Sequence, residues 1–190
     1  FIILITPIHH TFEQTMPENE VVKVSIDEIM DGSSIAKIGT DGNDDESLAI
    51  QLAFTGAGTA FIYRLNSGGV KASASLDDLD VEAKYSGTAG NKITVSVVVN
   101  GDKFDVITSF DGKVKDKQTV AEIADLVDND FVSFSGTGDL AASAGTALTG
   151  GTNGTVGATA YTNFLAAMDS YNFNCLAMPS TTAADITATI

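Results

Sequence analysis

The 190-residue sequence predicts an α+β protein of several domains. Residues 1–66 combine the alternation typical of strands with the three- and four-residue spacing of helices, and the same mixture returns after Thr155. Residues 70–138 show mainly alternation, interrupted by turn dipeptides. We therefore expect a small α/β domain, a β domain and a further α/β part, in that order.

Three strands are predicted in the N-terminal part. The apolar run F-I-I-L-I-T at residues 1–6 fits a strand, because it is too short for a signal-peptide core or a membrane span. Apolar and polar residues alternate around Val22, Val24 and Ile26, which predicts a second strand. Residues 59–65 form the third, so a helix between the last two completes an α/β pattern.

The acidic loop G-T-D-G-N-D-D-E at residues 39–46 precedes that helix, and Asp44 or Asp45 can cap it. The apolar face of the predicted helix consists of Leu48, Ala49, Leu52 and Ala53. Asp41, Asn43 and Asp45 place oxygen ligands at alternate positions, but the loop lacks the later glutamate of a calcium site. We interpret it as a solvated loop with a helix cap and predict no metal.

Two successive hairpins are predicted in the β domain. Their strands are expected at residues 93–99, 103–110 and 113–118. The dipeptides Asn100-Gly101 and Asp111-Gly112 separate these strands, and both accept the positive φ angles of tight hairpin turns. The result is a β-meander.

A short helix and a last strand are predicted to follow. Thr119 and Glu122 have the spacing of a capping box. Apolar residues then occur at helical spacing at Val120, Ile123, Ala124 and Val127. Residues 131–135 are the predicted strand.

The C-terminal part returns to α/β. Tyr161, Phe164, Leu165 and Met168 follow the i, i+3, i+4, i+7 pattern of a helix of about four turns whose apolar stripe faces a sheet. Residues 173–178 are the next predicted strand, and a further helix is expected to begin near Thr182.

Composition excludes several classes of partner. The chain has 25 acidic against 10 basic residues and a net charge of -15, which opposes binding to nucleic acid or to an anionic membrane surface. The single cysteine, Cys175, lies in the apolar run N-C-L-A-M, where we expect a small buried hydrophobic residue. One cysteine cannot form a disulfide within the chain, so a reducing compartment suits it.

The glycine-rich stretch G-T-A-L-T-G-G-T-N-G at residues 145–154 falls one substitution short of a phosphate-binding loop. Gly151 stands where that loop needs its lysine, and residues 131–190 contain no lysine or arginine. A triphosphate would therefore meet no positive charge here. We predict a linker that needs backbone freedom and close approach of chains rather than a nucleotide site.

No other constellation supports catalysis. His9 and His10 are the only histidines, and as neighbours in extended chain they point to opposite sides and cannot share a metal. No G-x-S-x-G turn exposes a serine. Arg64 ends a strand, where it could clasp an acidic partner, although a solvated strand end is the commoner case. We predict no catalytic, cofactor-binding or metal-binding residues, no cofactor and no enzyme activity.

Several separate motifs, in the same order along the chain, resemble the tail sheath proteins of contractile bacteriophages, especially those of Gram-positive hosts, and of defective prophages and phage-tail-like bacteriocins. They are F-I-Y-R-L-N-S-G-G-V-K-A (61–72), A-K-Y-S-G-T-A-G-N-K-I (83–93), F-D-V-I-T (104–108), Q-T-V-A-E-I-A-D-L (118–126), F-V-S-F-S-G-T-G (131–138), L-T-G-G-T-N-G (148–154) and Y-T-N-F-L (161–165). The first twenty residues match weakly.

The resemblance implies three domains. Residues 1–70 would be a small α/β domain, residues 71–150 a β-sandwich with one short helix, and residues 151–190 the start of a subtilisin-like α/β domain that is not a protease. Residues 148–154 would be the junction where the chain leaves the β-sandwich. Because the chain starts on an apolar strand and ends on T-A-T-I, we expect more polypeptide on each side.

The resemblance also implies the function. The subunit would polymerise helically around the inner tail tube, contract, and drive the tube through the bacterial envelope. Its partners would be identical subunits, the tube protein, and baseplate and tail terminator proteins, in a virion tail assembled in the host cytoplasm. The alternative is an acidic extracellular β-rich binding or adhesion module, which predicts repeated β domains; the sequence shows no internal repeat.

Overall fold

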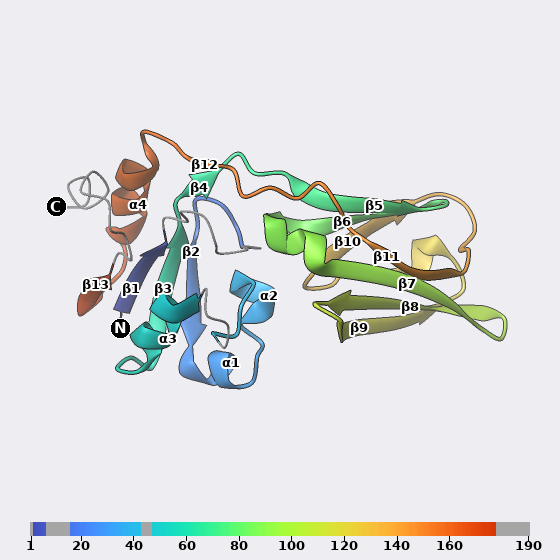
Figure 1. Cartoon of the computed structure of the whole chain (residues 1–190), viewed down its shortest axis with the longest axis horizontal. Helices are drawn as coiled ribbons and strands as arrows, with labels where there is room; N and C mark the ends of the chain where they lie inside the picture. The colour runs from blue at the N-terminus through green and yellow to red at the C-terminus, as the bar shows by residue number, and fades with distance from the viewer. Residues whose placement is uncertain (1, 7–15, 43–46, 178–190) are drawn as a thin grey trace. The chain divides into compact units, whose positions relative to one another are not determined.

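The chain forms two compact units in the computed structural model (Figure 1), which describes residues 2–6, 16–42 and 47–177. Phe1–Gly68 and Asn153–Ile190 make one, the α/β unit, and Gly69–Thr152 make the other, the sandwich unit. The fold is mixed and rich in strands. Residues after 152 join those before 69 in one unit. The predicted division into three domains, with boundaries at residues 70 and 150, stays a prediction.

A four-stranded sheet in the order β13-β1-β3-β2 is the centre of the α/β unit. Its strands are β1 (Ile2–Thr6), β2 (Val21–Ser25), β3 (Thr59–Arg64) and β13 (Cys175–Ala177). β1 pairs in parallel with both β13 and β3, whereas β2 is antiparallel to β3. The three strands predicted in the N-terminal part are therefore confirmed.

Alternation along β2 and β3 divides the apolar side chains of the α/β unit between the two faces of the sheet. Its helices are α1 (Ile26–Met30), α2 (Ile35–Ile38), α3 (Leu48–Phe54) and α4 (Ala160–Met168). Val24, Ala60 and Ile62 pack with residues of α2 and α3 in one buried cluster. Tyr63 and Leu65 pack with α4 in a second cluster, in which the rings of Tyr63 and Phe164 lie 5.4 Å apart.

Three predictions for the α/β unit are wrong in detail. Ile26 does not end the second strand but begins α1, because Ser25 and Glu28 form a capping box there. On α3 the predicted Ala53 is buried, but Leu52 is 60% exposed, and Ile50 and Phe54 are buried in its place. Helix α4 is shorter than the predicted four turns, at 9 residues. The predicted cap at Asp44 or Asp45 and the helix near Thr182 lie outside the described residues.

The sandwich unit consists of two sheets, β10-β6-β5 and β11-β7-β8-β9, drawn one above the other in Figure 1. Its strands are β5 (Lys71–Leu76), β6 (Leu79–Ser86), β7 (Ile93–Asn100), β8 (Lys103–Phe110), β9 (Lys113–Val120), β10 (Val132–Gly136) and β11 (Ser143–Ala147). Val81 and Val132 of one sheet and Val95 and Val106 of the other are buried. The two sheets therefore share an apolar interior.

Both predicted hairpins are confirmed. Asn100 pairs with Lys103, so the first turn consists of Gly101 and Asp102, with a φ of 65° at Gly101. The second turn consists of Asp111 and Gly112, with φ angles of 49° and 74°. Positive φ at both central residues matches the twist of the flanking strands, which explains why Asp-Gly occurs there.

The helix predicted after the hairpins is wrong. β9 continues to Val120, and only a 3-10 turn, Ile123–Asp125, follows. The hydroxyl of Thr119 donates to Asp105 at 2.6 Å and does not cap a helix. A tertiary hydrogen bond has thus replaced the local one that the sequence pattern favours. The predicted strand at residues 131–135 is confirmed as β10.

Candidate functional site

The place where the sandwich unit is inserted in the chain is the most organised polar site of the α/β unit. β4 (Asn66–Ser67) leads out of this unit and β12 (Thr155–Val156) leads back into it. The two strands pair antiparallel, with Ser67 opposite Thr155 and Asn66 opposite Val156. The outgoing and returning chains are therefore held side by side.

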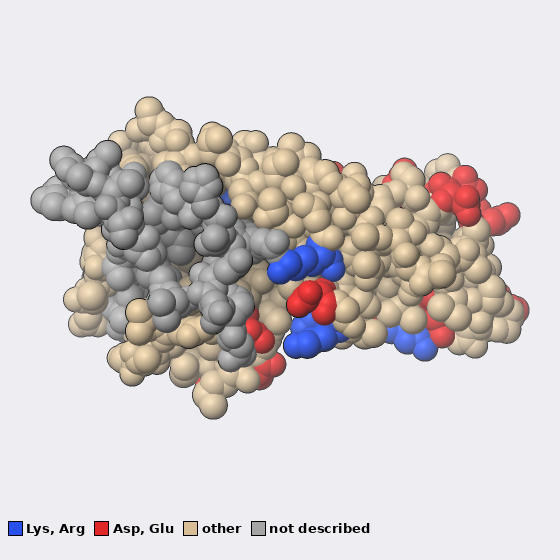
Figure 2. All heavy atoms as spheres, in the orientation of Figure 1, with Lys and Arg blue, Asp and Glu red and all other residues tan. Residues whose placement is uncertain are grey.

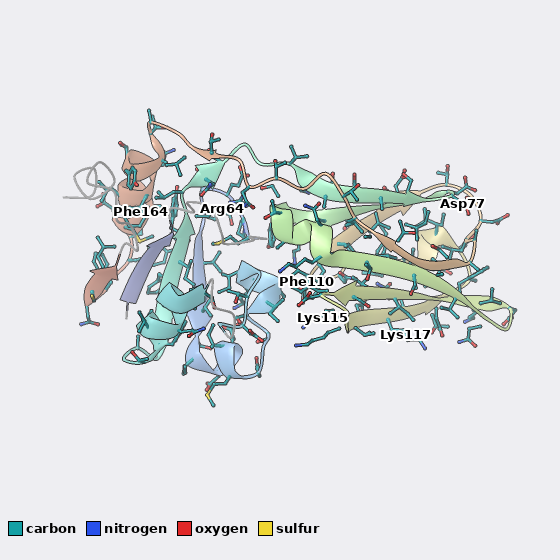
Figure 3. All side chains as sticks on the ribbon, viewed as in Figure 1. Arg64, Asp77, Phe110, Lys115, Lys117 and Phe164 are labelled. Atoms are coloured by element: carbon teal, nitrogen blue, oxygen red, sulfur yellow. The ribbon has the colours of Figure 1, made fainter. Side chains whose placement is uncertain are left out.

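Arg64, at the end of β3, binds the segments around this insertion (Figure 3). Its side chain is 0% exposed, and its guanidinium donates to the carbonyls of Met16 at 3.0 Å and Asn153 at 2.6 Å. Glu18 lies 3.6 Å from the guanidinium, and its carboxylate accepts a hydrogen bond from the Gly68 N–H at 2.9 Å. The prediction that Arg64 is a solvated strand end is therefore wrong, and the alternative, that Arg64 binds an acidic partner, is confirmed.

The chemistry of Arg64 is that of a structural cation. Burial lowers the pKa of its guanidinium, and the nearby charge of Glu18 raises it again. Arginine stays protonated in proteins because its ordinary pKa is so high. A guanidinium that keeps its proton and donates to the carbonyls of Met16 and Asn153 holds backbone segments in place and does not transfer protons.

The glycine-rich stretch offers few free backbone donors to a phosphate. Thr149 and Ser73 exchange two backbone hydrogen bonds, and the Thr152 N–H donates to the Val70 carbonyl at 3.0 Å. The Asn91 side chain accepts from the Gly151 N–H at 2.8 Å and donates to the Gly151 carbonyl at 3.1 Å. The N–H groups of Thr149, Gly151 and Thr152 are thus already bonded, whereas a phosphate loop presents such groups to its ligand.

A polar cluster on β7, β8 and β9 of the sandwich unit is likewise structural. Asp105 accepts hydrogen bonds from Lys117 at 2.8 Å, Thr119 at 2.6 Å and Asn100 at 3.1 Å. The Lys117 ammonium, with the hydroxyl and the amide, lowers the pKa of Asp105 to about 2. A carboxylate held in this state is a poor general base and a hydrogen-bond acceptor only. Lys117 is labelled in Figure 3.

The remaining sequence candidates do not form a site in the described part of the chain. His9, His10, Asn43 and Asp45 lie outside it. Cys175 is exposed, so the expectation of a buried cysteine is wrong. Among residues 2–6, 16–42 and 47–177, no group of acidic, histidine and cysteine side chains could hold a metal ion. None of the described helices is long and apolar enough to cross a membrane.

Comparisons with known proteins point to one family. Residues 67–153 match the phage tail sheath protein β-sandwich domain. The structure also resembles the solved sheath tail protein of Desulfitobacterium hafniense, with 35% identity and a TM-score of 0.85 over 98% of this chain and 43% of that one. The chain belongs to the phage tail sheath family.

Further relatives agree with this membership. The sheath tail protein of Listeria innocua has 32% identity and a TM-score of 0.81, covering 98% of this chain and 42% of that one. The phage-like element PBSX protein XkdK of Bacillus subtilis is 36% identical over 75% of this chain and 35% of the relative. The chain thus spans about a third of the length of this curated relative.

The partners of Arg64 and Gly151 in this site were not apparent in the sequence. Glu18 and Asn153 meet Arg64 from 46 and 89 positions away, and Asn91 meets Gly151 from 60 positions away. No local spacing links such residues. Arg64 and Gly151 stand out for their own positions in the sequence, and the runs 61–72, 83–93 and 148–154, which contain Arg64, Asn91 and Gly151, also resemble the sheath proteins.

Proposed function

We propose that this chain is part of the structural subunit of a contractile tail sheath, which polymerises helically around an inner tail tube and contracts to drive the tube through a bacterial envelope. The observation that carries the proposal is the likeness of 98% of the chain to a solved sheath tail protein at 35% identity. The match of residues 67–153 to a sheath β-sandwich domain supports it independently.

The physical basis would be two sets of subunit contacts. Contacts between different patches of identical subunits do not close on themselves and generate a helix. If two such sets have similar free energies, the helix has an extended and a contracted state, and the difference supplies the work of contraction. This mechanism needs neither a nucleotide nor a catalytic group, in agreement with the occupied N–H groups around Gly151.

The domain roles follow from the same proposal. Residues 71–150 would be the β-sandwich domain, and residues 1–70 and 151–190 would belong to a small α/β domain and to the beginning of a subtilisin-like, non-proteolytic domain. Identical subunits, the tube protein, and baseplate and terminator proteins would be the partners. The subunit would assemble in the host cytoplasm and reside in the virion tail.

The acidic surface of the sandwich unit would remain in water in such an assembly. Asp77, Asp78 and Asp80, around the turn between β5 and β6, are exposed. Figure 2 shows acidic side chains gathered at this end of the unit, where Figure 3 labels Asp77. Bringing many such surfaces into a dry interface would cost electrostatic free energy, because like charges repel more strongly when desolvated.

Electron microscopy of the full-length protein that contains this chain tests the proposal. We expect striated tubes, whose formation is unchanged by added ATP or by a chelator of divalent cations. A full-length protein that remains monomeric under conditions in which other sheath proteins polymerise would contradict the proposal and favour the acidic binding module.

A further inference from the structure

Strand β10 lies at the end of its sheet, so one of its edges has no neighbouring strand in the described part of the chain. It pairs antiparallel with β6, with Val132 opposite Ala83 and Phe134 opposite Val81. The Lys84 N–H donates to the Phe131 carbonyl at 2.9 Å, which marks the odd-numbered residues as the ones bonded to β6. The N–H and carbonyl groups of Val132 and Phe134 therefore point away from β6, toward the outer edge of the sheet.

Two consecutive side chains occupy this outer edge. The Val132 N–H donates to Oδ1 of Asn129, and the Phe134 N–H donates to Oδ1 of Asp128, both at 2.9 Å. The Val132 carbonyl accepts from the Asn129 backbone N–H at 3.0 Å. Asp128 and Asn129 thus bind the Val132 N–H and carbonyl and the Phe134 N–H, three of the groups that an added strand would use.

Asn129 is itself fixed by the opposite sheet. Its Nδ2 donates to Thr108 Oγ1 at 3.1 Å and to Asp116 Oδ2 at 3.0 Å, while its Oδ1 also accepts from the Phe131 N–H at 2.9 Å. Thr108 lies on β8 and Asp116 on β9, so the Asn129 side chain that binds the edge of β10 is also bonded to the second sheet. The side chain uses both its donors and its acceptor.

We propose that Asp128 and Asn129 close the outer edge of β10 and thereby exclude it as a site of strand addition between copies of this chain. An open strand edge is a template for pairing with another chain. The inference deepens the proposed function, because a sheath holds many copies of this edge close together. Contacts made there would be restricted to side chains, and the exposed carboxylate of Asp128 adds repulsion between two identical edges.

The test uses residues 1–190 with Asp128→Ala and, as a matched control, Asp128→Asn, whose amide oxygen can still accept from Phe134. Amide hydrogen exchange is measured by NMR at low protein concentration. We expect the Phe134 amide to exchange faster by about tenfold in Asp128→Ala, the factor expected for one lost hydrogen bond, and little change in Asp128→Asn. Both variants keep the bonds of Asn129, and protected amides in β7 and β8 report that each is folded.

Association is then measured by sedimentation velocity over a range of concentrations, together with the double variant Asp128→Ala/Asn129→Ala. We expect the opened edge to associate, and the Val132 and Phe134 amides to become protected again as concentration rises. An unchanged Phe134 exchange rate in Asp128→Ala, or a folded opened variant that stays monomeric, would overturn the inference. These results need no sheath, so they are independent of whether the full-length protein forms tubes.

Discussion

At the scale of single residues, the sandwich unit depends on positions with little room to change. A Cβ at Gly151 would lie 2.4 Å from the Gly87 carbonyl oxygen and 3.1 Å from Asn91 Oδ1. The first contact is with backbone, which cannot rotate away as a side chain can. Gly151, which stands where a phosphate-binding loop has its lysine, is thus required for the close approach of two chain segments.

Gly151→Ala should therefore destabilise the protein by about 1–3 kcal/mol, the usual cost of forcing extra atoms into a packed site. Gly157→Ala is the matched control, because a Cβ there meets nothing within 4 Å. Urea unfolding followed by circular dichroism gives both free energies. Equal stability of the two variants would show that the segments around Gly151 separate without cost.

Asp105 gives a residue-level prediction on pH. Its pKa is lowered from 3.8 to about 2 in the folded chain, chiefly by Lys117, so its contribution to stability is complete above about pH 4 and is lost as the pH falls toward about 2. Asp105→Asn and Lys117→Met should both reduce the fall in Tm over this range. A Tm that falls equally steeply in all three proteins would contradict the role of the cluster.

At the scale of elements, α4 is held to the sheet by one face. Phe164 and Met168 are buried against Tyr63 and Leu65, whereas the neighbouring Leu165 is 47% exposed. The sequence pattern placed all of the apolar residues of this helix on one stripe. The structure shows that the buried stripe is narrower, because Leu165 lies beside it and is partly in water.

Phe164→Ala should cost about 3–5 kcal/mol of unfolding free energy, as for other buried aromatic residues. Leu165→Ala, on the same helix but largely in water, should cost about 0.5 kcal/mol or less. Denaturant unfolding of both variants distinguishes them. A loss of stability that is as large for Leu165→Ala would mean that this exposed side chain is covered by something else.

Elements with a clear local signal could be predicted, and those decided by distant partners could not. The hairpins around Gly101 and Gly112 follow from turn chemistry that acts within a few residues. The helix expected at Thr119 failed because Asp105, 14 positions away, takes the Thr119 hydroxyl. Strand β11, in the run S-A-G-T-A, has no large apolar residue to mark it and forms because β7 supplies a hydrogen-bonding edge.

At the scale of the whole molecule, the division into two units predicts separable folding. The sandwich unit, Gly69–Thr152, has its own apolar interior and its own backbone closure, in which Val70 pairs with Thr152 and Ser73 with Thr149. Expressed alone, residues 69–152 should give a dispersed NMR spectrum and a cooperative thermal transition. A random-coil spectrum would show that this unit depends on the α/β unit for its fold.

The same division bears on assembly. Residues 1–190 carry a net charge of -15, and Asp128 and Asn129 occupy the edge of β10, so we expect little association through this edge. In the proposed sheath, strands exchanged between neighbouring subunits would supply the main contacts, since an added strand satisfies a whole row of backbone groups. Residues 1–190 should then sediment as a monomer or a weakly associating species, while the full-length protein forms large ordered tubes in the same buffer. Stable polymers from residues 1–190 alone would place the principal contacts within this chain and contradict the exchange of strands from elsewhere.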